Sequence, residues 1–129
     1  MKRASAAQQI HGSTEDLNDL ILDSITDIKG KNITTLDLRA LDEAPTDFFI
    51  ICEGDSNTQV RSIAENIHAR MKAEGGMFPG RGPEGLQTAK WVCLDYITTV
   101  VHIFHRETRG FYALEDLWSD ATSIEYTNL

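Results

Sequence analysis

Hydrophobic residues recur near the start of the chain with the spacing of an amphipathic helix. Ser13 and Thr14 precede this segment, and the acidic Glu15 and Asp16 favour a helix N-terminus through the helix dipole. Gly30 follows the last apolar position and marks the end of the helix. The stripe on one face consists of Leu17, Leu20, Ile21, Ser24, Ile25 and Ile28.

A second helix is predicted from Ser56, because Gln59 stands three residues later and completes a capping box. Its apolar positions are Val60, Ile63, Ala64, Ile67 and Met71, and it ends near Gly75 and Gly76. Glycines and prolines at 77–89 predict a mobile loop after it. A short C-terminal helix is predicted from the helical spacing of Phe111, Leu114, Leu117 and Trp118.

Four segments have the character of β-strands. Residues 33–38 begin with β-branched side chains, and residues 48–52 are continuously apolar, as is typical of a strand buried on both faces. Residues 91–96 and 100–104 are close enough in sequence to form a hairpin. The order of elements predicts an α/β fold with one mixed β-sheet and helices packed on it.

The length of 129 residues predicts one domain. We expect a flexible N-terminal tail at 1–13, a single domain at 14–120 and a C-terminal tail at 121–129.

The hairpin separates its side chains into two sets. If residues 97–98 form the turn, Trp91 lies opposite Phe104 and Cys93 opposite His102. One face then holds an aliphatic set suited to packing under helices: Val92, Leu94, Tyr96, Val101 and Ile103. The other face mixes aromatic and titratable groups: Trp91, Cys93, Asp95, Val100, His102 and Phe104. This second face is either buried under another helix or partly open for a protein partner, since aromatics in a polar patch are typical of interface hot spots.

Charge restricts the choice of partner. The chain has 12 Lys and Arg against 20 Asp and Glu, for a formal net charge of -8. Proteins that bind nucleic acid without sequence preference rely on Lys and Arg contacts to phosphates, so direct nucleic-acid binding is not expected. An acidic protein can instead dock on a basic protein.

No apolar run is long enough to span a membrane and two cysteines make no disulfide framework, so we expect a cytoplasmic protein.

Metal and phosphate sites find little support in the sequence. His102 and His105 are three positions apart on a predicted strand and point to opposite faces, which argues against zinc. Residues 53–56 precede a helix but lack both glycine-rich phosphate-binding patterns, which favours a turn and helix cap. We therefore expect no metal and no cofactor.

Catalytic arrangements are equally incomplete. Two-metal nucleotidyl transfer needs neighbouring carboxylates, and Asp95 lacks the first acidic residue of an Asp-x-Asp pair, although Asp37 lies on another strand. Cys93 opposite His102 could form a nucleophile and base, but no elbow motif supports this, and a cross-strand contact is the favoured interpretation. No catalytic residue is predicted.

Three blocks in order resemble the Iojap family, also called ribosomal silencing factors. They are residues 46–54 with Gln59, Val60, Ile63 and Ala64, then 91–96 with 100–104, then 111–118. The resemblance spans about residues 17–120. It implies a nucleotidyltransferase-like α/β fold without known catalysis. It also implies binding to the large ribosomal subunit through the large-subunit ribosomal protein numbered fourteen, which sterically blocks the small subunit and lowers translation when nutrients are scarce.

The resemblance suggests where the partner binds. The partner-binding role is carried onto Trp91 as the anchor, Asp95 as a pair for a basic side chain, His102 and Phe104 as flanking residues, and Leu94 and Tyr96 as second choices. Where the family usually has Gly-Asp after the tyrosine, this chain has Ile97 and Thr98, so another turn type is expected.

Other functions and assemblies stay open at this point. Organelle members of the family help large-subunit assembly, so an assembly adaptor is one alternative, and a nucleotidyltransferase-like enzyme is another. An exposed apolar sheet face also predicts self-association into a homodimer that could compete with ribosome binding.

Overall fold

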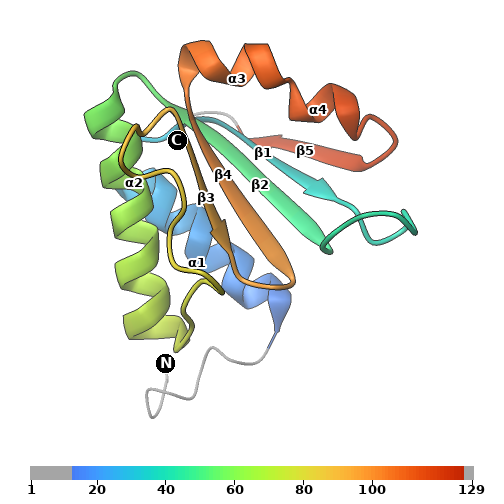
Figure 1. Cartoon of the computed structure of the whole chain (residues 1–129). Coiled ribbons are helices and arrows are strands. Elements are labelled where there is room, and N and C mark those ends of the chain that lie inside the picture. The colour runs from blue at the N-terminus through green and yellow to red at the C-terminus, as the bar shows by residue number, and fades with distance from the viewer. Residues whose placement is uncertain (1–12, 127–129) are drawn as a thin grey trace.

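The computed structural model describes residues 13–126 and is built on a five-stranded sheet with the order β3-β4-β2-β1-β5 (Figure 1). The strands are β1 (Lys31–Asp37), β2 (Phe48–Gly54), β3 (Trp91–Asp95), β4 (Thr99–His105) and β5 (Thr122–Tyr126). β2 and β4 run parallel, and all other neighbours are antiparallel. The mixed sheet of an α/β fold predicted from the sequence is therefore confirmed.

Helices α1 (Thr14–Asp27) and α2 (Asn57–Arg70) pack on one face of this sheet (Figure 1). A short π-helical segment, η3 (Met71–Gly75), continues α2 and ends at Gly76 in the left-handed conformation. The core between helices and sheet includes Leu20, Ile21, Ile25, Ile50, Cys52, Val60, Ile63, Ile67, Leu94, Val101 and Ile103. Both helices thus bury the apolar stripes that the sequence pattern assigned to them.

The predicted cap of α2 also joins the two helices. The Ser56 hydroxyl accepts a hydrogen bond from the Gln59 backbone N–H at 3.1 Å. The Gln59 side chain accepts from the backbone N–H of Asp55 at 2.7 Å and donates to the carbonyls of Ile28 and Lys29, both at 3.2 Å. The start of α2 is therefore fixed to the end of α1 through one glutamine.

The predicted C-terminal helix is two short helices, α3 (Arg106–Tyr112) and α4 (Leu114–Leu117). Ala113 separates them because its φ of 46° places it in the left-handed region, which ends α3. Leu114 and Trp118 then pack against Leu36 and Phe49 on the second face of the sheet. α3 and α4 lie near the end of the sheet where β4 finishes (Figure 1), so they cover only part of this face.

The hairpin has the register that alternation predicted. Trp91 pairs with Phe104, Cys93 with His102 and Asp95 with Val100. Its turn is unusual because Ile97, a β-branched residue, has a φ of 75°.

Hydrogen bonds around the turn keep Ile97 in this conformation. Its N–H donates to the Asp95 carboxylate at 2.8 Å, and its carbonyl accepts from the Thr46 hydroxyl at 2.7 Å. The N–H of Thr98 donates to the carbonyl of Tyr96 at 2.9 Å, which closes a three-residue turn.

The prediction of a C-terminal tail at 121–129 is wrong for Thr122–Tyr126. This segment is the edge strand β5, with Ile33 opposite Tyr126 and Leu36 opposite Ser123. Its side chains are mostly exposed, so backbone hydrogen bonds rather than an apolar pattern hold it, and the sequence gives little sign of it. Of the predicted N-terminal tail, residues 1–12 lie outside the described part, and Ser13 caps α1 by accepting a hydrogen bond from the N–H of Asp16.

The loop at 77–89 covers the outer edge of β3. Glu84 and Cys93 exchange two backbone hydrogen bonds of 3.0 and 2.9 Å, and Gly80 donates to the carbonyl of Asp95 at 2.8 Å. Arg61 of α2 holds the loop by donating to the carbonyl of Leu86 at 3.1 Å. The loop therefore pairs an edge that would otherwise be open to other chains.

None of the helices described between Ser13 and Tyr126 has both the length and the apolar character that a membrane span requires.

Candidate protein-binding surface

The second face of the sheet is partly exposed over β3 and β4. Trp91, Cys93 and Val100 are half-buried there, and Asp95 is exposed. Tyr112 of α3 adjoins them, because its ring centroid lies 4.6 Å from that of Trp91. We call Trp91, Cys93, Asp95, Val100 and Tyr112 the Trp91 surface.

Aromatic rings pack in a row from the buried Phe104 through Trp91 to Tyr112 and Phe111. The Trp91 ring stacks on Phe104, which is fully buried, with 5.0 Å between ring centroids. On the open side Tyr112 is 47% exposed, and Phe111, with its ring centroid 5.0 Å from that of Tyr112, is 79% exposed. Sequence reasoning placed Phe111 and Tyr112 in a helix and missed their role here, although both belong to the block at 111–118 that resembles the family.

His102 fixes the orientation of the Trp91 ring. The indole N–H of Trp91 donates to Nδ1 of His102 at 3.1 Å, so Nδ1 is unprotonated and the imidazole carries its proton on Nε2. Burial lowers the pKa of His102 to about 4, because the charged form would lose its hydration. Phe49 lies against the imidazole edge to face, with 4.5 Å between ring centroids. His102 is therefore a neutral acceptor that holds the indole in place.

Cys93 and His102 do not have the properties of a nucleophile and its base. The Cys93 sulfur lies 3.5 Å from His102 Nδ1, an atom that already accepts the indole N–H of Trp91. Burial raises the pKa of the Cys93 thiol to about 11, so the sulfur is protonated at neutral pH. The contact is the cross-strand contact that the sequence favoured.

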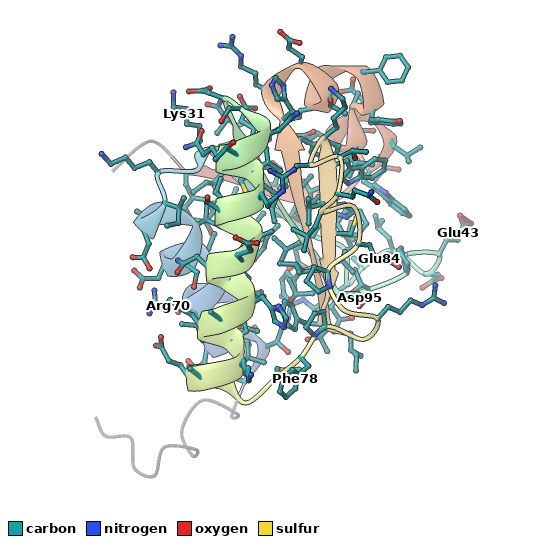
Figure 2. The ribbon with its side chains drawn as sticks, turned by 60° about the vertical axis from the view of Figure 1, so that its left-hand side comes forward. Lys31, Glu43, Arg70, Phe78, Glu84 and Asp95 are labelled. Carbon is teal, nitrogen blue, oxygen red and sulfur yellow. The ribbon has the colours of Figure 1, made fainter. Side chains whose placement is uncertain are left out.

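Two carboxylates, Asp95 of the Trp91 surface and Glu84 of the loop at 77–89, lie at the end of β3 away from Tyr112. Asp95 and Glu84 lie beside each other (Figure 2) and line a hollow of about 160 Å3 with Arg81 and Gly82. Within the described part of the chain, neither Asp95 nor Glu84 forms an ion pair. The Asp95 carboxylate accepts the backbone N–H of Ile97 at 2.8 Å.

The two strand carboxylates considered for metal binding lie apart. Asp37 is on β1 and Asp95 on β3, with β2 and β4 between them, which puts them roughly 14 Å apart at the usual strand spacing. Asp37 also accepts hydrogen bonds from Arg39 at 3.0 and 2.7 Å, which lower the pKa of its carboxyl group. Among residues 13–126 no cluster of His, Cys, Asp or Glu has the arrangement of a metal site.

Three of the predicted partner-binding residues have no exposed surface for a partner. Leu94 and Tyr96 are 0% and 2% exposed in the core under the helices, on the face opposite Trp91. Their assignment as contact residues is corrected by the register, because alternate residues of a strand point to opposite faces. Phe104 is buried beneath Trp91 and supports it. Of the predicted residues, Trp91 is half-buried and Asp95 is exposed, whereas His102 is 7% exposed and contacts Trp91 through its indole N–H.

Comparison with known proteins assigns the family. The model of the family "Ribosomal silencing factor during starvation" matches residues 11–129. A ribosomal silencing factor of Halalkalibacterium halodurans is 34% identical over 113 residues, which cover 88% of this chain and 94% of the relative. A crystal structure of a Chromobacterium violaceum protein has a TM-score of 0.77 at 33% identity and covers 83% of this chain and 87% of that one.

A more distant match is a mouse protein named "Mitochondrial assembly of ribosomal large subunit protein 1", 32% identical over 78 residues that cover 57% of this chain and 33% of that protein. The family model matches residues 11–129, a range that includes β5, and the resemblance found in the sequence blocks is confirmed. This chain belongs to the ribosomal silencing factor family.

Proposed function

We propose that this protein binds the large ribosomal subunit through the Trp91 surface and docks on the large-subunit ribosomal protein numbered fourteen. Bound on the joining face, it occupies the space that the small subunit needs, and translation is repressed. Family membership supports the ribosome as the target. The proposal places the protein in the cytoplasm, where ribosomes work.

The observation that carries the proposal is Trp91, a half-buried aromatic residue whose ring is held in place by its neighbours. Phe104 stacks beneath it and His102 fixes its N–H, so its ring is already ordered before a partner arrives. A pre-ordered aromatic loses little conformational entropy on binding and buries a large area. Such residues account for much of the binding energy at protein interfaces.

The charge of the chain supports a protein rather than an RNA contact. The net charge of -8 opposes binding to a bare phosphate backbone. Asp95 of the Trp91 surface and Glu84 beside it form no ion pair among residues 13–126, and their charge complements a basic protein.

Steric blocking requires affinity and volume but no chemistry, and we propose a function without catalysis. The protonated Cys93 thiol and the paired Asp37 carboxylate give no support to an enzyme. An assembly adaptor is the second candidate, because a relative is named for assembly of the large ribosomal subunit. Both functions use the same contact and differ in whether mature subunits are blocked.

Self-association is proposed through the same apolar face. A homodimer that covers the Trp91 surface would compete with ribosome binding. Light scattering at micromolar concentration tests this, and a monomer mass would count against it.

Co-sedimentation tests the proposed surface. Purified large subunits are mixed with wild type, Trp91→Glu or Ile124→Glu and sedimented through sucrose. A carboxylate in an interface core costs several kcal/mol of binding free energy, so Trp91→Glu should not co-sediment with the large subunits. Ile124 is the matched control, because it is 52% exposed on β5 at the opposite edge of the sheet.

The three outcomes separate the partner from the surface. If Trp91→Glu is folded and is the only one of the three proteins absent from the pellet, both parts of the proposal are supported. Pelleting of all three proteins keeps the partner and rejects the Trp91 surface. Absence of wild type from the pellet rejects ribosome binding. Circular dichroism of each variant establishes that it is folded.

A further inference from the structure

Helix α3 buries no residue against the rest of the protein. It contains seven residues, Arg106–Tyr112, and none of them is buried. Gly110 weakens it further, and a helix this short is not stable alone in water. Its place on the molecule therefore depends on a few side-chain contacts.

Arg109 makes the most extensive of these contacts. Its side chain is only 12% exposed. Nε and Nη2 donate to the Glu115 carboxylate at 3.2 and 2.5 Å, and Nη2 also donates to the Thr34 hydroxyl at 3.3 Å. Nη1 donates to the carbonyl of Asn32 at 2.5 Å and to the Glu53 carboxylate at 3.2 Å. Five N–H donors thus meet five acceptor contacts, which only the planar guanidinium can achieve.

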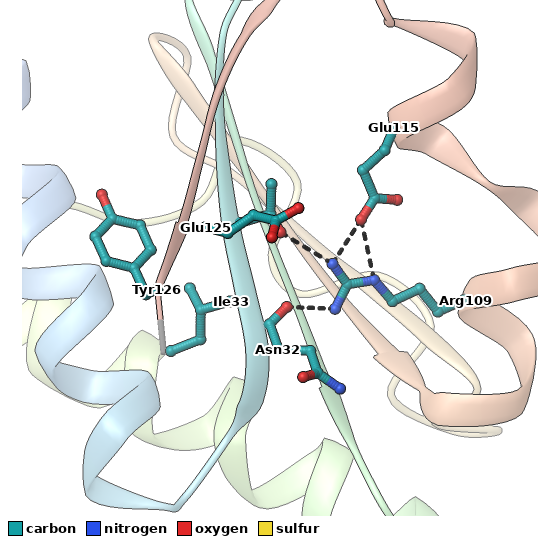
Figure 3. Close-up of a pocket in the computed structure, with 7 residues that line it drawn as sticks. Asn32, Ile33, Arg109, Glu115, Glu125 and Tyr126 are labelled. Carbon is teal, nitrogen blue, oxygen red and sulfur yellow. Dashed lines mark hydrogen bonds and ion pairs between the residues drawn. The ribbon is translucent and has the colours of Figure 1, made fainter. Parts of the chain in front are cut away.

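These contacts join α3 to three other elements. Figure 3 shows Arg109 reaching from α3 toward Glu115 of α4 and Asn32 of β1, and Glu53 lies on β2. Glu53 is 13% exposed and Glu115 33% exposed, so water screens these charges only partly. The guanidinium also lines a cavity of about 420 Å3 between α3–α4 and the β1–β5 edge, so it bridges a gap that apolar packing leaves open.

Tyr112 is the last residue of α3 and lies three residues, about one helical turn, after Arg109. Tyr112 is the residue that contacts Trp91. We propose that Arg109 is a positioning residue of the Trp91 surface: it holds α3 so that Tyr112 stands against Trp91 in the geometry that the partner meets. The binding part of this inference rests on the proposed function, whereas the positioning part concerns the free protein.

The first test observes the free protein by NMR. Arg109→Lys keeps the charge but cannot make the same contacts, and it should remove the nuclear Overhauser effects between the Tyr112 and Trp91 rings. Amide exchange in α3 should accelerate at least about tenfold, while α2 is unchanged. Arg70→Lys is the matched control, because Arg70 pairs with Asp23, Asp27 and Glu74 on the α1–α2 side.

Glu115→Ala is the second variant, used where Arg109→Lys does not fold. It removes two of the contacts made by Arg109 and lies outside the Trp91 surface. It should give the same loss of ring contacts. Retained ring contacts together with unchanged α3 exchange in the folded variant would overturn the inference.

The second test is a double-mutant cycle on large-subunit affinity. Tyr112→Ala should weaken binding about tenfold, Arg109→Lys by a similar factor, and the double variant no more than Tyr112→Ala alone. Additive losses would overturn the inference, because Arg109 would then act independently of Tyr112. If wild type does not bind large subunits, the proposed function fails, and the NMR result alone decides whether Arg109 positions α3.

Discussion

Acidification should destabilise this protein through His102. The side chain is 7% exposed, and burial lowers its pKa to about 4, against 6.5 for an ordinary histidine. The folded state therefore keeps a neutral imidazole over a range in which the unfolded chain takes up a proton. Stability rises with pH wherever the unfolded state binds more protons.

The pKa values define the window and the size of the effect. The stability linked to His102 is fully present above the unfolded pKa of 6.5 and is lost as pH falls from there toward the folded pKa of about 4. One pKa unit corresponds to about 1.4 kcal/mol, so the total loss is about 3 kcal/mol. At about pH 5 the loss should already reach about 2 kcal/mol of unfolding free energy.

Urea unfolding of wild type and His102→Gln at about pH 7.5 and about pH 5 measures this contribution. Glutamine keeps an acceptor for the Trp91 N–H but does not titrate, so it should flatten the pH dependence by about 2 kcal/mol. Equal pH dependence of wild type and His102→Gln would refute the burial argument.

Two backbone positions give further predictions. Gly85→Ala should cost about 3 kcal/mol of unfolding free energy, because a Cβ there would lie 2.2 Å from the carbonyl oxygen of Trp91 at a φ of +92°. Gly82→Ala, at a φ of +73° with open space around it, should cost only about 1 kcal/mol, and equal losses in urea would contradict the clash. Ile97→Gly should raise the unfolding free energy by about 1 kcal/mol, because the 75% exposed isoleucine contributes little burial and glycine relieves the left-handed strain. A destabilised Ile97→Gly protein in the same assay would show that the isoleucine makes a compensating contact.

Local patterns in the sequence predicted the parts of the fold that depend on them. Alternation at 91–96 and 100–104 gave the hairpin register, because a slip of one residue would expose the aliphatic set that packs under α1 and α2. Ser56 and Gln59 likewise marked the start of α2, since capping is a local interaction.

Contacts between distant segments could not be predicted from those patterns. β5 is held by a backbone ladder to β1 and has exposed side chains, so periodicity does not reveal it. Arg109 gains its role from Glu53 and Asn32, which are 56 and 77 residues away in the chain. The Trp91–Tyr112 contact depends on where that arginine places α3. A single sequence gives no measure of such separations in space.

Subunit joining tests the central claim that the Trp91 surface silences the large subunit. Large subunits are incubated with protein, small subunits are added, and the rise in light scattering reports joined ribosomes. Wild type and the Ile124→Glu control should suppress that rise. With folded Trp91→Glu the rise should equal the one measured when no protein is added. Suppression by Trp91→Glu equal to that by wild type would contradict the account.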